Sequence, residues 1–422
     1  MESFVDSTGT PLRLGPSVGR VGGEGKVLEL ADRPGLLAKL YHTRPRPDQI
    51  AKLRHLIRVR SDQVGRFTAW PSGLVLDQTG SVRGFLMPRV SGCEVHQVYH
   101  PRERAARFPD AHWDFLVHVA RNCAAAFDEV HRLGAIIGDV NEGNVLVRDN
   151  GTVMLIDCDS YQAQHQGTTW GCDVGVPLWT APELQGKPFR GLIRVRNHDL
   201  FGLALLIFHL LFMGRHPFVG VPFGHDGVTP DRAIAEFKFV FSASKPLPDL
   251  APPASCPTMA SLPGEIRVLF DRAFLQGSGN DGSRPEAHVW AIALEQLARS
   301  LRACPQSEAH LYWKGAPSCP WCTVRRNGGP DFFAAATINA VPVLPKAVPQ
   351  APWRGLSSRF GSLRRAVVAG TVLLGVSWLS GLGHIQPPQP QPAPRALPVN
   401  HVAKPLHHAT ALRRHHRRAH QK

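Results

Sequence analysis

The chain has 422 residues, 43% of them hydrophobic, and is long enough for a two-lobed domain with appendages. Its net charge of +15 is unevenly spread: from Phe332 onward there are 12 Lys or Arg and no Asp or Glu, and the preceding 331 residues carry 36 basic against 33 acidic side chains. The nearly neutral part has the composition of an ordinary globular domain, so we expect no specific binding of nucleic acid.

The eight cysteines are too few and too scattered for a disulfide framework, which favours reduced thiols in a cytosolic domain. The first residues, MESFVDSTGTPLRL, lack a charged segment followed by an apolar stretch, and we therefore expect no signal peptide.

In chain order, residues 10–90 alternate turn signals with short β-rich runs such as "LLAKLY", and one helical segment over 47–60 interrupts them. Residues 91–303 instead show helical periodicity, at 112–133, 197–213 and 286–303. This order predicts an α+β fold with a small β-rich lobe followed by a larger helical lobe.

Several polar residues fall at the ends of apolar runs in these lobes. Lys39 lies in a strand-like context after the Gly-rich stretch "GRVGGEGKVLEL", Asp139 and Asn144 share the loop "IIGDVNEGNVLV", and Asp157, in "LIDCDS", ends an apolar run. Phosphoryl transfer from ATP needs a backbone cover over the phosphates, a cation on them, oxygen ligands for magnesium and a carboxylate near the attacking hydroxyl. These residues supply that set: Lys39 as cation, Asn144 and Asp157 as Mg²⁺ ligands, and Asp139 as base.

The order and spacing of these residues resemble the protein kinase superfamily over about residues 10–303. Asp139 and Asn144 match its catalytic loop, and Asp157 stands at the place of its Asp-Phe-Gly aspartate. Three structural residues match as well: Glu183 of "APE", Asp199 of the central helix, and Arg284, the late partner of that glutamate. More narrowly, "GGEGKV", "GFLMPRV" and "CPWC" resemble a bacterial kinase-like family, some members of which carry helix-hairpin-helix DNA-binding regions; no such region is seen here.

The resemblance implies an ATP-dependent protein kinase, of the Ser/Thr type, with Mg²⁺ as cofactor and a protein as substrate. It implies that Asp139 and Lys39 are catalytic and that 87–90 forms the hinge against adenine. The expected ATP-binding residues are Gly19, Gly22, Gly23, Gly25, Val27, Lys39, Met87 and Val90.

The sequence also departs from the family pattern. Ile137 and Gly138 replace the His-Arg before the catalytic Asp, and Asn141 stands where a Lys is usual. No Glu occurs between residues 29 and 94, which leaves Asp48 or Gln49 as the nearby substitutes for the helix glutamate that pairs with Lys39. Asp159, in place of the Gly, is an extra metal ligand or a turn residue. Two alternatives therefore stay open: a nucleotide-binding pseudokinase scaffold at the membrane, and a small-molecule phosphotransferase similar to those for aminoglycosides or choline.

Residues 304–325 contain four soft ligands within nineteen residues. Cys319 and Cys322 form a C-x-x-C turn, and Cys304 and His310 precede it. This set predicts a structural zinc knuckle with no open coordination position.

Beyond it, 326–365 reads as a linker, and 366–383 is an uncharged stretch of 18 residues that we expect to form one transmembrane helix. Four arginines (354, 359, 364 and 365) precede this stretch, whereas only Arg395 occurs in the first fifteen residues after it. The positive-inside rule then leaves the kinase-like part in the cytoplasm of a bacterial cell, with a single pass through the inner membrane and a disordered basic His/Pro-rich tail over 384–422.

Overall fold

The computed structural model describes residues 3–19, 22–223 and 228–333. The expected transmembrane helix (366–383), the tail (384–422) and most of the linker (326–365) lie outside these residues. Within the part that is described, no helix is long and apolar enough to cross a membrane.

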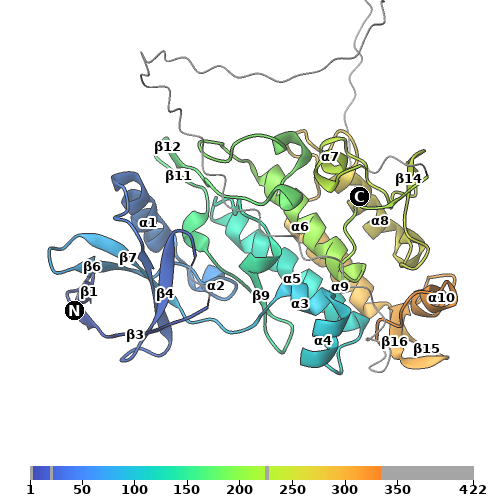
Figure 1. Ribbon diagram of the computed structural model, residues 1–422, viewed down its shortest axis with the longest axis horizontal. Coiled ribbons are helices and arrows are strands. Elements are labelled where there is room, and N and C mark those ends of the chain that lie inside the picture. Colours follow the sequence, from blue (N-terminus) through green and yellow to red (C-terminus); the bar gives the residue numbers. More distant parts are fainter. Residues whose placement is uncertain (1–2, 20–21, 224–227, 334–422) are drawn as a thin grey trace, which may run out of the picture. The chain divides into compact units, whose positions relative to one another are not determined.

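The first lobe is built on one antiparallel sheet of seven strands in the order β2-β1-β6-β7-β5-β4-β3 (Figure 1). Its strands are β1 (Phe4–Asp6), β2 (Pro11–Leu12), β3 (Leu14–Ser17), β4 (Gly25–Leu30), β5 (Leu36–Tyr41), β6 (Gly73–Asp77) and β7 (Val82–Pro88). The sheet begins before residue 10 because Phe4 packs into the same apolar cluster as Leu12 and Leu28. The small β-rich lobe expected from the sequence is therefore present.

The central strands set the position of Lys39, since β5 pairs with β4 on one side and β7 on the other. Lys39 stands opposite Val27 in β4 and Phe85 in β7. Two glycines permit this pairing: a Cβ on Gly25 would lie 2.4 Å from the carbonyl oxygen of Leu40, and one on Gly84 would lie 1.9 Å from that of Lys39. The close approach of the strands therefore requires glycine at position 25.

Helix α1 (Pro47–Val59) starts with a proline at its first turn, where the missing N–H costs nothing. Its Leu53 packs into a cluster of the first lobe, and its Leu56 packs into the core cluster of the second lobe. The short helix α2 (Asp62–Gly65) follows, with Ser61 as its N-cap.

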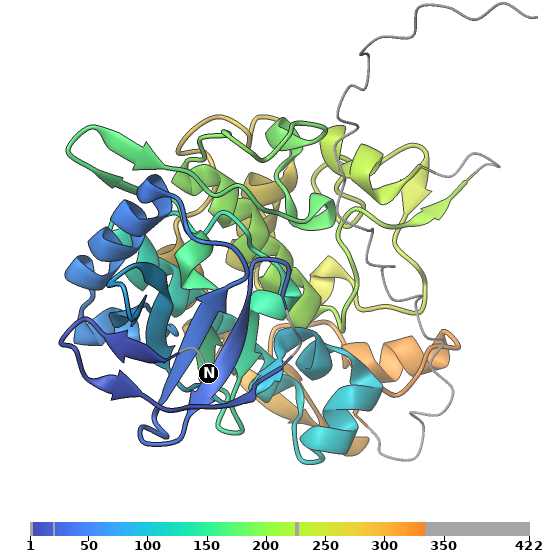
Figure 2. The same ribbon diagram turned by 60° about the vertical axis from the view of Figure 1, so that its left-hand side comes forward.

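The second lobe is mainly helical and packs around α5 (Trp113–Arg132) and α6 (Arg196–Leu211). Helix α6 is buried along nearly its whole length, as expected for a segment as apolar as "LFGLALLIFHLL". Figure 2 shows α6, in green, running through this lobe. Its other α-helices are α3 (Val95–Tyr99), α4 (Pro101–Arg107), α7 (Pro230–Ala235), α8 (Gly264–Phe274), α9 (Ala287–Arg299) and α10 (Pro320–Arg326).

Short strands complete this lobe, and six of them pair as three hairpins that lie near the residues discussed below. The strands are β8 (Cys93–Glu94), β9 (Val145–Val147), β10 (Val153–Leu155), β11 (Ala163–His165), β12 (Thr168–Trp170), β13 (Val221–Pro222), β14 (Leu250–Ala251), β15 (Leu301–Cys304) and β16 (Ser307–Trp313). The helix expected over 286–303 ends at Arg299, because Leu301–Cys304 pairs with β16 as a hairpin instead.

Candidate functional site

The loop that carries Asp139 is hydrogen-bonded to Asp199, at the start of α6. The buried Asp199 carboxylate accepts hydrogen bonds from the backbone N–H groups of Ile137, at 2.7 Å, and Gly138, at 2.8 Å. The Nε2 atom of His131, from α5, lies 3.0 Å from the same carboxylate. Charge-assisted bonds of this kind fix the backbone of the loop just before Asp139.

Both carboxylate oxygens of Asp139 contact asparagine amides. Asn141 donates to Oδ1 at 3.0 Å, and Asn144 donates to Oδ2 at 3.2 Å and to the Asp139 carbonyl at 3.0 Å. Burial raises the pKa of Asp139, while these two hydrogen bonds oppose the shift. Because the Asn144 amide nitrogen is turned toward Asp139, and no described residue donates to its Oδ1, that oxygen is available as a ligand.

Asp157 lies next to Asn144 across the β9–β10 hairpin, since the N–H of the adjoining Ile156 donates to the carbonyl of Asn144 at 3.0 Å. Its backbone has the left-handed conformation (φ 56°), and its side chain is 51% exposed. A half-exposed carboxylate beside a free amide oxygen is a donor set that suits Mg²⁺, which prefers hard oxygen ligands and keeps several waters.

Lys39 extends from β5 toward the same region, and its closest partner is Asp159. The Lys39 ammonium lies 2.8 and 3.0 Å from the two oxygens of Asp159, and 3.4 Å from Oδ1 of Asp157. Burial alone would lower the pKa of Lys39, but the charges of Asp159 and Asp157 outweigh it and hold the pKa above its ordinary value. A hollow of about 290 Å³ beside this ion pair is lined by Glu24, Tyr41 and Lys52, among others.

The two substitutes for the helix glutamate that the sequence offered do not reach Lys39. Asp48 instead accepts from the Arg46 side chain at 3.1 Å, and the Gln49 side chain accepts from the Arg46 backbone N–H at 2.9 Å. Both are bound at the N-terminus of α1, and that expectation was wrong.

The residues expected to bind the nucleotide fall into two groups. Val27, Met87 and Val90 belong to one apolar cluster, together with Val18 and Ile156, which flank the glycine-rich turn and Asp157. The remaining residues are the glycines: Gly19 has a positive φ of 72°, Gly22 and Gly23 are exposed with room around them, and Gly25 lies in the strand.

Gly138, which replaces the usual arginine, lies against Arg194, from the segment before α6. Arg194 is buried and its Nη2 donates to the carbonyl of Val174 at 2.7 Å. Burial still raises the pKa of Asp139, and the charge of Arg194 only opposes part of that rise. A cation therefore lies beside the loop that carries Asp139, although residues 136–144 of that loop include no Lys or Arg.

Glu183 and Arg284 form a bidentate ion pair, with distances of 2.6 and 3.0 Å. The guanidinium of Arg284 is fully buried and also donates to the carbonyls of Ala273 and Asn197. This pair ties the segment at Pro182–Leu184 to the core of the helical lobe.

The four residues of the expected zinc knuckle converge. The ligand atoms of Cys304, His310, Cys319 and Cys322 all lie within 4.8 Å of one another. Cys304 Sγ is 3.7 Å from Cys322 Sγ, and His310 Nδ1 is 3.7 Å from Cys319 Sγ and 3.5 Å from Cys322 Sγ. A tetrahedral ion with Zn–S of about 2.3 Å and Zn–N of about 2.0 Å requires separations of roughly 3.5–3.8 Å, so the donors fit zinc.

The knuckle also has an outer partner and a fixed place on the lobe. His310 Nε2 lies 3.0 Å from Oδ1 of Asp331, the second-sphere carboxylate that commonly orients a zinc-bound histidine. Trp321 packs edge-on against Trp113 at the start of α5, with ring centroids 5.4 Å apart.

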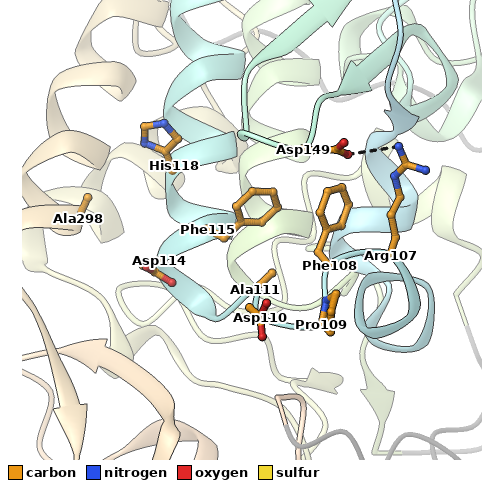
Figure 3. A pocket seen from close by; sticks show the side chains of 10 residues that line it. All are labelled: Arg107, Phe108, Pro109, Asp110, Ala111, Asp114, Phe115, His118, Asp149 and Ala298. Carbon is orange, nitrogen blue, oxygen red and sulfur yellow. Dashed lines mark hydrogen bonds and ion pairs between the residues drawn. The ribbon is translucent and has the colours of Figure 1, made fainter.

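A larger hollow, of about 650 Å³, lies elsewhere on the helical lobe (Figure 3). Figure 3 shows Phe108 and Phe115 side by side on its wall and Asp149 beside Arg107, 3.4 Å apart. None of the residues that line it belongs to the set around Asp139.

Comparison with known proteins agrees with the geometry. The chain is 40% identical over 326 residues to protein kinase YegI of Escherichia coli K12, a match that covers 76% of this chain. The chain belongs to the protein kinase superfamily. A kinase of the same name from Escherichia coli O157:H7 is 40% identical over 330 residues, or 77% of this chain. The chain spans about half the length of these curated relatives, 50% of the K12 protein and 51% of the O157:H7 protein.

More distant kinases match shorter parts. Serine/threonine-protein kinase PknK of Mycobacterium bovis is 25% identical over 222 residues, which are 50% of this chain and 17% of that protein. Among solved structures, a rhoptry kinase from Toxoplasma gondii is similar over 71% of this chain and 82% of its own, with a TM-score of 0.47 and 16% identity. No protein-family model matches the chain.

Sequence reasoning missed three residues of this candidate site. Tyr41 donates to Asp159 at 3.0 Å, Lys52 reaches the segment after Asp157, and Arg194 stands by Gly138. Asp159 was noticed, but its role as the partner of Lys39 was not. The missing glutamate in the helix was the available signal, because a buried lysine on a central strand needs an acidic partner from somewhere.

Proposed function

We propose that the protein is an ATP-dependent protein kinase that transfers the γ-phosphoryl group to a Ser or Thr hydroxyl. The observation that carries the proposal is the placement of Lys39, Asp157, Asn144 and Asp139 along one continuous path. Lys39 lies 3.4 Å from Asp157, Asp157 adjoins Asn144 across one hairpin, and Asn144 donates to Asp139. A chain that only bound nucleotide would need no carboxylate at the far end of this path.

In this account the apolar cluster of Val27, Met87 and Val90 receives the adenine ring. Lys39 supplies a fixed positive charge for the phosphates, and Asn144 and Asp157 hold Mg²⁺ through oxygen atoms. When bound, Mg²⁺ supplies neutralisation of the negative charge on the phosphate oxygens. The glycines at 19, 22 and 23 allow backbone N–H groups to approach the phosphates.

Asp139 accepts the proton of the attacking hydroxyl or orients that hydroxyl. The amides of Asn141 and Asn144 leave the carboxylate fixed in direction, and its raised pKa makes it a better proton acceptor near neutral pH than an exposed aspartate. Since Asn141 provides no charge, Arg194 is the nearby cation that offsets negative charge at the loop.

A protein acceptor is favoured over a small molecule by the Glu183–Arg284 pair. That pair anchors Pro182–Leu184, and the ring of Trp179 just before it stacks on His209 of α6, with centroids 5.0 Å apart. A segment anchored in this way offers a fixed surface to which an extended polypeptide can bind. The Ser/Thr class is supported by the name of the PknK relative.

We further propose that the knuckle binds a structural zinc ion, on the support of its donor distances and of Asp331. The membrane anchor over 366–383, with the kinase lobes in the cytoplasm, is proposed from the sequence pattern alone.

The test is a transfer assay on the full chain in detergent with labelled ATP and Mg²⁺. Acceptors are generic proteins in one arm, and an aminoglycoside and choline in the other. Label on Ser or Thr of a protein is the expected result. Label on the small molecules alone would assign the other phosphotransferase class, and ATP binding without any transfer would assign a scaffold.

A further inference from the structure

Lys39 and Asp159 form an ion pair that is almost sealed from solvent. Their side chains are 9% and 3% exposed, and both oxygens of Asp159 lie within hydrogen-bond distance of the ammonium. The hydroxyl of Tyr41, two residues along β5, donates to the same carboxylate at 3.0 Å. A buried carboxylate and a buried ammonium each need such partners, since either one alone would be strongly destabilising.

This arrangement favours Asp159 as the partner of Lys39 over Asp159 as a metal ligand. Both oxygens of Asp159 already accept from Lys39, one also from Tyr41, and its side chain is buried, whereas Asp157 is half-exposed and lies farther from the ammonium. A metal ligand at this site must face the bound nucleotide and its water. Asp157 meets that condition, and Asp159 does not.

Helix α1 contacts the segment that follows Asp159 through a lysine. The Lys52 ammonium is buried and donates to the backbone carbonyls of Ser160, at 3.0 Å, and Gly171, at 3.2 Å. The same helix packs His55 on His165 and Trp170 of the β11–β12 hairpin, with ring centroids 4.9 and 5.5 Å apart. Figures 1 and 2 both show that hairpin lying against α1. The helix is thus tied to the two ends of the segment that follows Asp159.

We propose that Asp159 is the positioning residue of Lys39, in place of a helix glutamate, and that Lys52 fixes the segment carrying Asp159 against α1. The inference rests on the proposed function and names how that site holds its phosphate-binding cation. Movement of α1 would then act on Lys39 through the backbone at Ser160 and Gly171.

The experiment compares Asp159→Asn with Asp48→Asn in the full chain. Asp48 is a matched control, because it is a carboxylate on α1 that pairs only with Arg46 among the contacts described above. The affinity for ATP with Mg²⁺ is measured by titration, and kcat and KM by transfer. Asp159→Asn is expected to raise the Kd and KM for ATP roughly tenfold or more, since it removes a charge-assisted contact. Asp48→Asn should leave both unchanged.

Two further arms separate positioning from metal binding. In Asp159→Asn the Mg²⁺ concentration for half-maximal rate should stay at the wild-type value, whereas Asp157→Asn should raise it. Asp159→Glu, which keeps the charge, should restore part of the lost ATP affinity. If Asp159→Asn does not fold, Tyr41→Phe removes one hydrogen bond to Asp159 and should raise the KM for ATP by about two- to fivefold.

The outcomes also distinguish this inference from the proposed function. Wild-type chain that binds ATP but transfers nothing would remove the function, and the Kd comparison would still decide the role of Asp159. Unchanged ATP affinity in Asp159→Asn would overturn the inference and leave the function intact. Rescue of that variant by excess Mg²⁺ would make Asp159 a metal ligand and overturn it as well.

Discussion

The guanidinium of Arg194 occupies the space in which a side chain on Gly138 would begin. A Cβ on Gly138 would lie 2.5 Å from Nη1 of Arg194 and 2.7 Å from Cβ of Cys172. Gly138 also has a φ of +74°, which side chains adopt only with strain. The arginine absent from the loop is thus replaced by one that is 56 positions later, and the glycine makes room for it.

Gly138→Ala should therefore lower the free energy of unfolding by roughly 2–4 kcal/mol, because strain and overpacking add. Gly134→Ala is the matched control: it has the same φ of +74° but nothing within 4 Å of its Cβ. It should cost only about 1 kcal/mol. Chemical denaturation of both variants checks this, and equal losses would mean that Arg194 and Cys172 do not crowd Gly138.

Breaking the Glu183–Arg284 pair from one side should be costly. Arg284→Met and Glu183→Gln are each expected to destabilise by roughly 3–5 kcal/mol, as removal of one partner leaves the other buried charge or its donors uncompensated. The double variant should lose clearly less than the sum of the two. Thermal and chemical unfolding of the four proteins gives the coupling energy. The exposed pair of Glu295 and Arg299 serves as control, with an expected coupling of about 0–1 kcal/mol. Strict additivity at Glu183 and Arg284 would refute the account.

Removal of the proposed zinc ion should destabilise the helical lobe as well as the knuckle. The two are in contact, because Trp321 packs on Trp113 of α5 and Arg104 of α4 donates to the carbonyl of Phe332 at 2.7 Å. One zinc per chain is expected by elemental analysis, and a chelator should lower the melting temperature. Cys319→Ser should abolish zinc binding, while Cys256→Ser, a buried cysteine outside the cluster, should retain it. Asp331→Asn should weaken zinc binding by about 10–100-fold. A full zinc content in Cys319→Ser would contradict the site.

Stability should fall in mild acid because of His209. Burial lowers its pKa to about 3, and its Nδ1 lies 2.7 Å from the carbonyl of Leu205. The unfolded chain takes up a proton near pH 6.5 but the folded chain does not, so stability is lost as pH falls from 6.5 toward 3. At pH 5 this difference in proton uptake lowers the free energy of unfolding by roughly 2 kcal/mol. His209→Gln should flatten the stability profile between pH 7 and 5 by that amount, as measured in urea. An unchanged slope would show that His209 does not set it.

The parts of the site that could be predicted are those whose residues lie close together in the sequence, within one short motif. Asp139 and Asn144 lie within one loop, and Cys319 and Cys322 within one turn, so local spacing alone brings them together. Glu183 and Arg284 are 101 positions apart, and only the family resemblance suggested that they meet.

The parts that could not be predicted depend on contacts that no local pattern records. Lys39 meets Asp159 over 120 positions, and Lys52 meets the backbone of Ser160 and Gly171, which any residue type could provide. The same holds for the end of α9: helical propensity continues past Arg299, but pairing with β16 draws Leu301–Cys304 into a strand. Tertiary hydrogen bonds outweigh local preference in each case.

The most direct test of the account is the rate of transfer to protein by Asp139→Asn at saturating ATP and Mg²⁺. Asparagine keeps the shape of the side chain but cannot accept the proton, so kcat should fall by about 10²–10⁴-fold while the Kd for ATP stays within a factor of about two. A variant that transfers phosphoryl to protein at the wild-type rate would contradict the role of Asp139, and with it the function proposed for this chain.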